Sequence, residues 1–221
     1  MAVVVVGINE RDVSLDVFEQ GAIAERDLPK ALRALCDSEH VSEAVVLSTC
    51  LRTEVYAVVE RFHDGLADIE SFFRSRSGAV GGGSISLSDH LSCWIDDAAI
   101  SHLFEVAAGI DSPVLGEGEI LRQVRSAAEV ARRERAAGRV LGTLFRHAVE
   151  AGKRVRTETA IAKGTTSLAH AAVALAADHL EGGLEDRSVL VIGAGEMGAG
   201  FSKALSRSAA PAPARVVVAS R

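Results

Sequence analysis

The spacing of hydrophobic residues divides the first half of the chain into strands and helices. Short apolar runs rich in β-branched residues predict strands, and apolar positions three or four residues apart predict helices. We expect strands at residues 3–7, 43–48 and 53–60, and helices at 27–36, 62–76 and 96–108. This mixture is typical of an α/β domain, with a sheet and covering helices.

The pattern changes after residue 108. Residues 109–119 are polar and rich in turn-forming residues, and two long helices are expected after them, separated near Gly138. The further expected elements are helices at 120–137, 140–158 and 167–180, a strand at 189–192, a helix reaching residue 207 and a strand at 215–219. The glycine-rich residues 78–84 are typical of a flexible loop or of an engineered linker.

The composition predicts an ordinary soluble globular protein. Of the 221 residues, 24% are charged and 48% are hydrophobic, which allows one large or two modest domains. No apolar run approaches the ~20 residues of a membrane span. The three cysteines, Cys36, Cys50 and Cys93, are odd in number and lack metal-ligand spacing, so we expect a reducing, cytoplasmic compartment.

Charge is distributed unevenly along the chain. The net charge of −6 argues against a general nucleic-acid-binding protein, yet residues 121–156 contain ten basic and three acidic residues. This segment has an excess of seven positive charges, and the remainder of the chain carries −13. A basic region on an acidic protein suits a polyanionic partner, although solvated helix faces would have the same composition.

Cys50 is the candidate for covalent chemistry. It follows the apolar run at 45–47 and precedes a second strand-like run at 55–59, so strand, turn and strand is the simplest interpretation, with Cys50 at or near the bend. If the backbone is extended there, Cys50 and Arg52 point to the same side, and the cation raises the thiolate fraction of a thiol whose ordinary pKa is about 8.5. A small buried cysteine at a strand end is the alternative.

A glycine-rich loop marks a second candidate site. The strand at 189–192 precedes Gly193-Ala194-Gly195-Glu196-Met197-Gly198, a helix and another strand, which is the context of a dinucleotide-binding loop. The glycines permit a tight turn and close approach of a pyrophosphate to a helix N-terminus. Ser220 and Arg221 stand where NAD-binding proteins have an acid, so NADP is favoured. A purely structural glycine turn is the alternative.

Several motifs in a fixed order resemble those of the glutamyl-tRNA reductase family. They are Gly7-Ile8-Asn9, Ser48-Thr49-Cys50-x-Arg52-Thr53-Glu54, His102-Leu103-Phe104, Asp111-Ser112 with Gly116-Glu117, Gln123-Val124, Lys153-Arg154-Val155-Arg156-Thr157-Glu158-Thr159, and the loop at 193–198. The resemblance covers nearly the whole chain, and several spaced motifs are more specific than any one of them. It identifies Cys50 as the position of the family's nucleophile.

The resemblance implies NADPH-dependent reduction of glutamyl-tRNA(Glu) to glutamate-1-semialdehyde, the first step of tetrapyrrole (porphyrin and haem) biosynthesis from glutamate. The cysteine forms a thioester and expels the tRNA, and a hydride then reduces the thioester. Arg52 is placed on the substrate carboxylate, and His102 is a proton donor or positioning group. The further substrate contacts implied are Thr49, Leu51, Ser112, Glu117, Gly118, Glu119 and Gln123. Without the resemblance, His102 would be interpreted as a helix histidine bonded to a carbonyl.

The resemblance also implies partners and a domain order. The basic helices would face tRNA phosphates, glutamate-1-semialdehyde aminomutase would be a partner, and the full-length family member would be a homodimer. The predicted domains are a catalytic domain at 1–160, a linking helix at 161–187 and the start of a Rossmann-type NADP-binding domain at 188–221. One strand–helix–strand unit is half of such a domain or less, so the chain is interpreted as a fragment that binds NADPH weakly and hydrolyses its thioester as an esterase.

Four positions differ from the family pattern: Glu10 replaces a histidine, Leu51 an asparagine, Gly118 a proline and Glu119 an amide. Two other functions therefore stay open. One is an NADP-dependent dehydrogenase of small molecules in which Cys50 is structural. The other is a catalytically impaired relative that binds tRNA, haem or a partner as a regulator.

Overall fold

In the computed structural model, the described residues are 1–77, 87–162, 168–207 and 212–220, and they form two compact units. The first unit comprises Met1–Ala108 and Ile120–Val155, and the second comprises Gly109–Glu119 and Arg156–Arg221. Within the described segments, no helix combines the length and the hydrophobicity needed to cross a membrane. The predicted α/β class is confirmed, whereas the predicted domain limits stay a prediction. The predicted glycine-rich loop at 78–84 lies outside the described residues.

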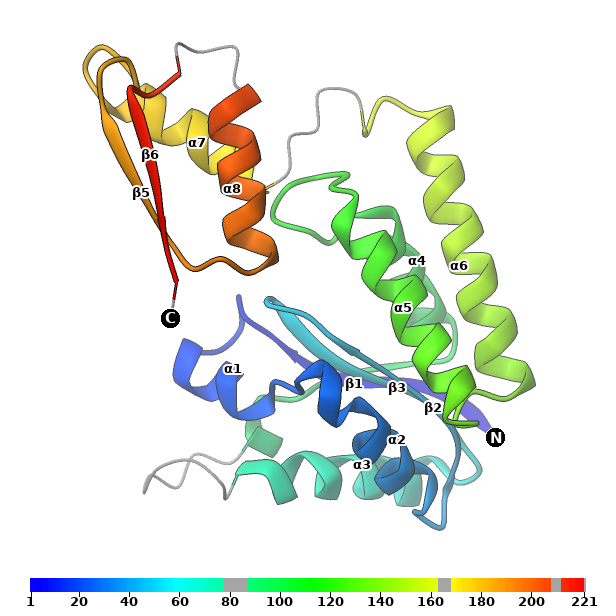
Figure 1. Cartoon of the computed structure of the whole chain (residues 1–221). Coiled ribbons are helices and arrows are strands. Elements are labelled where there is room, and N and C mark those ends of the chain that lie inside the picture. Colours follow the sequence, from blue (N-terminus) through cyan, green and yellow to red (C-terminus); the bar gives the residue numbers. More distant parts are fainter. Residues whose placement is uncertain (78–86, 163–167, 208–211, 221) are drawn as a thin grey trace. The chain divides into compact units, whose positions relative to one another are not determined.

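A four-stranded antiparallel sheet organises the first unit (Figure 1). Its strands, β1 (Ala2–Asn9), β2 (Val41–Ser48), β3 (Arg52–Val59) and β4 (Ser92–Ile95), follow the order β2-β3-β1-β4. Every residue of the strand β3 is buried, including the polar residues Arg52, Thr53 and Glu54 at its beginning. The three predicted strands of this unit are confirmed. The short edge strand β4 was not predicted, because its residues are only half-buried or exposed.

Helices cover both faces of this sheet. On one face lie α1 (Leu15–Gly21), α2 (Leu28–Cys36) and α3 (Phe62–Ser77), and on the other lie α4 (Asp97–Ala108), α5 (Glu119–Arg133) and α6 (Arg139–Glu158) (Figure 1). The five predicted helices are confirmed, and the short helix α1 was not predicted. α5 ends four residues before the predicted limit of 137, because Arg135 adopts a left-handed conformation with φ of 59°.

The carboxylate of Glu43 on β2 fixes the beginning of α6. Its Oε1 accepts a hydrogen bond from the Val140 N–H at 3.0 Å, and its Oε2 accepts one from the Leu141 N–H at 2.7 Å. A Cβ at Gly138 would lie 2.5 Å from the Glu43 Oε1, so glycine leaves the room that this contact needs. The predicted helix break near Gly138 is confirmed, and the cap by Glu43 gives it a physical cause.

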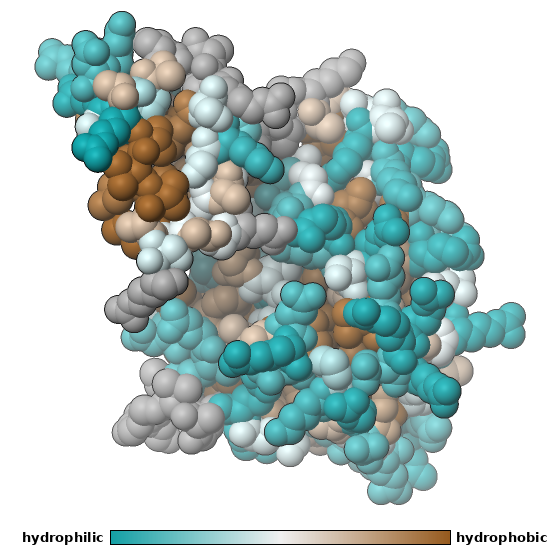
Figure 2. Space-filling model, viewed as in Figure 1, coloured by the Kyte–Doolittle hydropathy of each residue, from teal (hydrophilic) through white to brown (hydrophobic). Residues whose placement is uncertain are grey.

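The second unit contains a parallel strand–helix–strand arrangement, as the sequence predicts. β5 (Ser188–Ile192) pairs with β6 (Arg215–Ala219) in parallel, and α8 (Glu196–Arg207) connects them. α7 (Leu168–His179) packs with α8 over a small core of Ala169, Val173, Leu184, Val191, Ala204 and Leu205. The two strands also carry exposed apolar side chains, and a brown area marks them in Figure 2: Leu190, Ile192, Val216, Val217 and Val218.

Replacing Glu43 with alanine is expected to lower the free energy of unfolding by about 1–2 kcal/mol, because two amides at the beginning of α6 lose their acceptor. Urea unfolding followed by the fluorescence of Trp94, the single tryptophan of the sequence, measures the change. Glu39→Ala is the matched control, because Glu39 is exposed and precedes the same strand. An equal loss of unfolding free energy in Glu43→Ala and Glu39→Ala would contradict the capping role of Glu43.

Candidate active site

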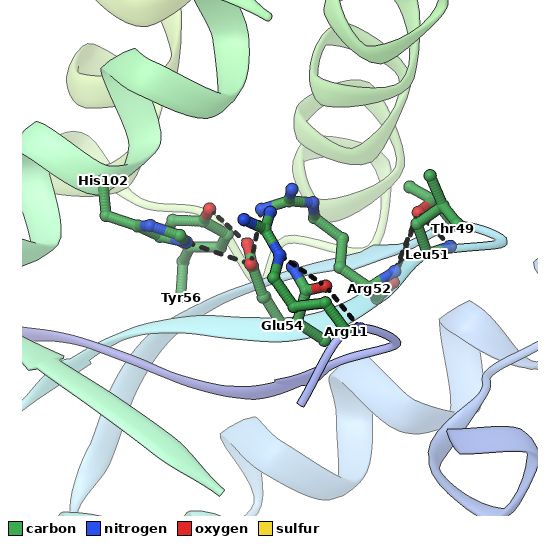
Figure 3. Close-up of polar contacts among 8 residues, drawn as sticks. Arg11, Thr49, Leu51, Arg52, Glu54, Tyr56 and His102 are labelled. Carbon is green, nitrogen blue, oxygen red and sulfur yellow. Dashed lines mark hydrogen bonds and ion pairs between the residues drawn. The ribbon is translucent and has the colours of Figure 1, made fainter. Parts of the chain in front are cut away.

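Cys50 lies at the tip of the hairpin that joins β2 to β3. The Thr49 N–H donates to the Arg52 carbonyl at 2.8 Å, and the Thr49 Oγ1 accepts hydrogen bonds from the N–H groups of Leu51 and Arg52, both at 3.1 Å (Figure 3). These bonds close the hairpin around Cys50 and Leu51. The predicted bend is confirmed. The backbone bends at Cys50, so the strand alternation that would place its side chain on the same side as Arg52 does not apply there.

The three cysteines differ in their surroundings. All of them lie in the described part of the chain, and none is disulfide-bonded. Burial, together with the negative charge of Asp37, raises the pKa of the half-buried Cys36 thiol. Cys50 is exposed at the hairpin tip, so the alternative of a buried packing cysteine does not hold. An accessible thiol on a rigid hairpin is suited to attack a large substrate.

The carboxylate of Glu54 lies at the centre of a buried polar network, which we call the Glu54 network (Figure 3). The Arg52 Nη1 donates to the Glu54 Oε1 at 3.0 Å, and the His102 Nε2 lies 3.0 Å from the same oxygen. The Tyr56 hydroxyl donates to the Glu54 Oε2 at 2.6 Å. Arg52 and Glu54 are each 2% exposed and His102 is 7% exposed, so the network is shielded from water.

Strand alternation brings this network together. Arg52, Glu54 and Tyr56 are two residues apart on β3 and therefore point to one face of the sheet, the face covered by α4, which carries His102. Gly7 on β1 pairs with Glu54, and a Cβ at Gly7 would lie 2.7 Å from the Glu54 Cα. The predicted residues Arg52 and His102 are thus brought together by Glu54.

An aromatic ring holds the other side of His102. The imidazole stacks on the indole of Trp94, with ring centroids 4.0 Å apart and an angle of 9° between the planes. Trp94 lies on β4, the strand next to β1. The orientation of His102 is therefore fixed by a stacked ring and by a hydrogen-bonded carboxylate.

Opposing effects set the ionisation of Glu54. Burial alone would raise the pKa of its carboxyl group. The hydrogen bond with His102 and the charge of Arg52 lower this pKa, and the charge of His102 and the hydrogen bond from Tyr56 lower it further. Together they outweigh the effect of burial and hold the pKa of Glu54 below its ordinary range. Glu54 is therefore a carboxylate at neutral pH, able to orient both Arg52 and His102.

Glu54, Tyr56 and Trp94 were not predicted as site residues. A signal for Glu54 is present in the sequence, since Arg52 and Glu54 directly precede the apolar run at 55–59. Two opposite charges on one face of a buried strand must find partners. The partner Tyr56 follows at the same spacing, whereas Trp94 comes from a strand that the hydrophobic pattern did not predict.

Most of the remaining predicted substrate contacts belong to the second unit. Ser112, Glu117, Gly118 and Glu119 lie in the loop Gly109–Glu119, whereas Gln123 lies half-buried on α5 in the first unit. The loop turns back on itself through two glycines with positive φ angles. They are Gly109, at 76°, and Gly116, at 72°, and the Gly116 N–H donates to the Gly109 carbonyl at 2.9 Å.

Arg156 fixes this loop from the end of α6. Its Nη2 donates a hydrogen bond to the Glu117 carbonyl. Desolvation lowers the pKa of the Arg156 guanidinium, and the charge of Glu117 opposes that shift. Gly116 packs against the backbone of Ile161, where a Cβ would lie 2.9 Å from the Ile161 carbonyl carbon. Arg156 belongs to a motif that carries the resemblance, but the sequence assigned it no role in the site.

The glycine loop of the second unit makes a tight turn directly before a helix. Gly193 has φ of 107°, and its N–H donates to the Ala219 carbonyl at 2.7 Å. α8 begins at Glu196, directly after this turn, and a Cβ at Gly198 would collide with the Gly193 carbonyl oxygen. The other described positions of the prediction, Ala194, Gly195, Met197 and Ser220, are exposed, and Arg221 lies outside the described residues. The preference for NADP stays a prediction.

Comparisons with known proteins agree on one family. The family model described as glutamyl-tRNA(Glu) reductase, N-terminal domain, matches residues 6–159. Glutamyl-tRNA reductases from Paenibacillus macerans and Kineococcus radiotolerans are 40% and 42% identical over 221 residues, which is 100% of this chain and 49% and 48% of those proteins. The one from Pelotomaculum thermopropionicum is 45% identical over 197 residues, or 89% of this chain and 44% of that protein.

A solved structure gives the same result. The glutamyl-tRNA reductase from Methanopyrus kandleri matches with a TM-score of 0.67 and 34% identity, covering 99% of this chain and 49% of that chain. The chain thus spans about half the length of the relatives that it matches.

Glu54→Gln is expected to change how stability depends on pH. Because the pKa of Glu54 is lowered in the folded state, its contribution is fully present above the ordinary glutamate pKa of about 4.3 and is lost as the pH falls below it. At neutral pH the variant, which leaves Arg52 without its buried counter-charge, should lose about 3–5 kcal/mol of unfolding free energy. The deficit should shrink in acid.

Unfolding in urea at a series of pH values, followed by Trp94 fluorescence, tests this expectation. Glu60→Gln is the control, because Glu60 is exposed at the other end of β3. A deficit of Glu54→Gln that is the same at neutral and acidic pH would show that the carboxylate charge is not what stabilises the network.

Arg156→Met is expected to loosen the loop Gly109–Glu119. Losing a charged hydrogen bond to the Glu117 carbonyl should speed hydrogen exchange of the loop amides about ten- to a hundredfold. Hydrogen-exchange mass spectrometry measures the rates, with Arg215→Met as an exposed control in the same unit. Unchanged exchange at Gly116 and Gly118 would contradict the anchoring role.

Proposed function

The chain belongs to the glutamyl-tRNA reductase family, and on this premise we propose that it supplies the cysteine chemistry of an NADPH-dependent reductase. The reaction converts glutamyl-tRNA(Glu) to glutamate-1-semialdehyde, the first step of tetrapyrrole biosynthesis from glutamate. The observation that carries the proposal is the exposed Cys50 thiol at a hairpin tip whose β3 arm begins in the buried Glu54 network. A nucleophile that attacks a bound ester from a fixed position needs a rigid support of this kind.

The first step is acyl transfer to Cys50. The thiolate sulfur forms a bond to the ester carbonyl carbon of glutamyl-tRNA, the carbon–oxygen bond to the terminal ribose breaks, and the ribose oxygen leaves as a hydroxyl after taking up a proton. His102 is the proposed donor or positioning group for that proton, since its Nε2 is held by Glu54 and its ring by Trp94.

Substrate recognition is assigned to two groups of residues. In the first unit, Arg52 binds the carboxylate of the glutamyl side chain with a guanidinium that Glu54 orients, and Thr49, Leu51 and Gln123 contribute further contacts. In the second unit, the proposed contacts are Ser112, Glu117, Gly118 and Glu119, on the loop that Arg156 anchors.

The second step is reduction of the thioester. When bound, NADPH supplies the hydride that the thioester carbonyl accepts. The tight turn at Gly193 and Gly198 before the N-terminus of α8 is assigned to the pyrophosphate, and Ser220 with Arg221 is assigned to the 2′-phosphate. The bond between the Cys50 sulfur and the acyl carbon then breaks, which regenerates the thiolate and releases the aldehyde.

The proposal includes protein partners of the whole enzyme. The product is a reactive aldehyde, so direct transfer to glutamate-1-semialdehyde aminomutase would protect it, and homodimerisation is proposed for the full-length protein. One rival function has a specific observation in its favour. Leu51 and Glu119 depart from the family pattern, which favours a regulator that binds tRNA without deacylating it.

Cys50→Ser is expected to abolish covalent capture of glutamate. Single-turnover mixing with tRNA charged with radiolabelled glutamate, without NADPH and with an acid quench, should leave label on the wild-type protein. In the variant the rate of capture should fall at least about 10³-fold, because an alcohol at that position lacks a thiolate.

Cys93→Ser is the control for this measurement, because Cys93 is also an exposed cysteine. It should retain the label. Absence of label on the wild-type protein, with tRNA still bound, would overturn the catalytic proposal in favour of the regulator. Equal labelling of the wild type and Cys50→Ser would exclude Cys50 as the nucleophile.

A further inference from the structure

Four arginines cluster where α5 turns into α6. Arg132, Arg133, Arg135 and Arg139, which we call the turn arginines, are all exposed, and within the described part of the chain no ion pair involves them. The one acid among them, Glu134, bonds Arg33 of α2 at 2.7 Å. The carboxylate of Glu43 also lies beside the turn, where it bonds the Val140 and Leu141 N–H groups, so the four arginines outnumber these two acids. Hydrophilic side chains cover this end of the two helices in Figure 2.

Two of the turn arginines occupy positions that do not favour them. Arg135 has φ of 59°, the left-handed conformation in which helices usually end with glycine or asparagine. Its helix is closed there by hydrogen bonds from the Ala136 and Ala137 N–H groups to the Ala131 carbonyl, at 2.9 and 3.3 Å. The local fold would be more stable with glycine at position 135.

Arg139 is disfavoured for a different reason. It is the first residue of α6, where the helix dipole is positive and acidic residues are preferred, and the first turn of α6 contains no acid. The amides of this turn are bonded instead by Glu43 from β2. Cations retained at locally unfavourable positions indicate a role outside the stability of the fold.

The cationic surface continues along a groove between the two helices. The groove has a volume of about 420 Å³ and includes Arg125, Arg132, Arg146 and Lys153 in its lining. Its two acids are already engaged, since Glu129 bonds Arg125 at 2.8 Å and Glu150 bonds Arg146 at 3.3 Å. The lining thus contains four cations and two acids, an excess of two positive charges along the groove.

We propose that the turn arginines and this groove bind the phosphate backbone of the tRNA part of the substrate. The inference rests on the proposed function, in which the substrate is an aminoacylated tRNA. Guanidinium groups on an exposed turn suit phosphates, which they can bind through two parallel hydrogen bonds. Backbone contacts of this kind position the RNA without reading its sequence.

The test removes three cations and compares two faces of the sheet. The turn variant is Arg133→Gln, Arg135→Gly and Arg139→Gln in one chain. The control variant is Lys30→Gln, Arg61→Gln and Arg74→Gln, which removes three exposed cations from the opposite face of the sheet. Binding of fluorescently labelled, unacylated tRNA(Glu) is measured by anisotropy at several salt concentrations.

The turn variant should bind tRNA at least about tenfold more weakly at low salt, and the slope of log affinity against log salt should shrink by about two to three. The control variant should keep the affinity and the slope of the wild type. The melting temperature of the turn variant should not fall, because the substitutions at Arg135 and Arg139 relieve unfavourable positions and Arg133 is an exposed residue with no ion pair in the described part of the chain. Lost binding therefore cannot be ascribed to unfolding. A second RNA of unrelated sequence should behave in the same way as tRNA(Glu).

Three results would overturn the assignment. If the turn variant bound tRNA with the affinity of the wild type, this surface would be excluded as the tRNA-binding site, and the proposed function would be unaffected. No tRNA binding by the folded wild type would reject the proposed function along with the surface. Binding of polyglutamate that equals the binding of tRNA in affinity and salt dependence would replace the RNA with an acidic protein segment. Reaction of Cys50 with a small glutamate ester that lacks RNA, measured in both variants, separates the surface from the acyl chemistry.

Discussion

The structure of the first unit depends on one buried carboxylate. Glu54 is ionised, is 2% exposed and contacts three side chains from two elements, so its removal from water is compensated by hydrogen bonds from Arg52, His102 and Tyr56. This arrangement restricts the surrounding sequence: β1 must have a glycine opposite Glu54, and α4 must present His102 at the sheet. The same contacts that stabilise the fold also orient the two side chains proposed to act on the substrate.

Cys50, in contrast to Glu54, has to be exposed to solvent. Burial stabilises the thiol rather than the thiolate, as the raised pKa of Cys36 illustrates, so a nucleophilic cysteine belongs outside the core. A hairpin tip provides that exposure, and Thr49 makes the tip rigid by bonding three backbone groups across it. The exposed Cys50 is thereby only two residues from Arg52, the first residue of β3 and a member of the buried Glu54 network.

The sequence predicted the regular elements well where the apolar pattern was long. The runs that became β1, β2 and β3 are buried on both faces, and α3 to α6 have extended apolar stripes, so their patterns are strong. β4 and α1 were missed because four half-exposed residues and seven helical residues give too little periodicity. For the site, Cys50 was found by residue type and motif, whereas Glu54 was missed as a participant because its partner His102 meets it only through the packing of α4 on the sheet.

Residues that break local rules fall into two groups in this chain. Glu54 in a strand interior and Gly138 before a helix are unfavourable in isolation, but the fold compensates both: Glu54 has three hydrogen-bonding partners, and Gly138 makes room for the cap by Glu43. Arg135 and Arg139 are different, because a left-handed arginine and a cation at a helix N-terminus each cost about 0.3–2 kcal/mol and no ion pair within the described residues repays them. A cost that the fold compensates is explained by the fold. The unfavourable positions of Arg135 and Arg139 are not compensated by the fold, and both place a positive charge on the same exposed turn. A partner of opposite charge best explains them.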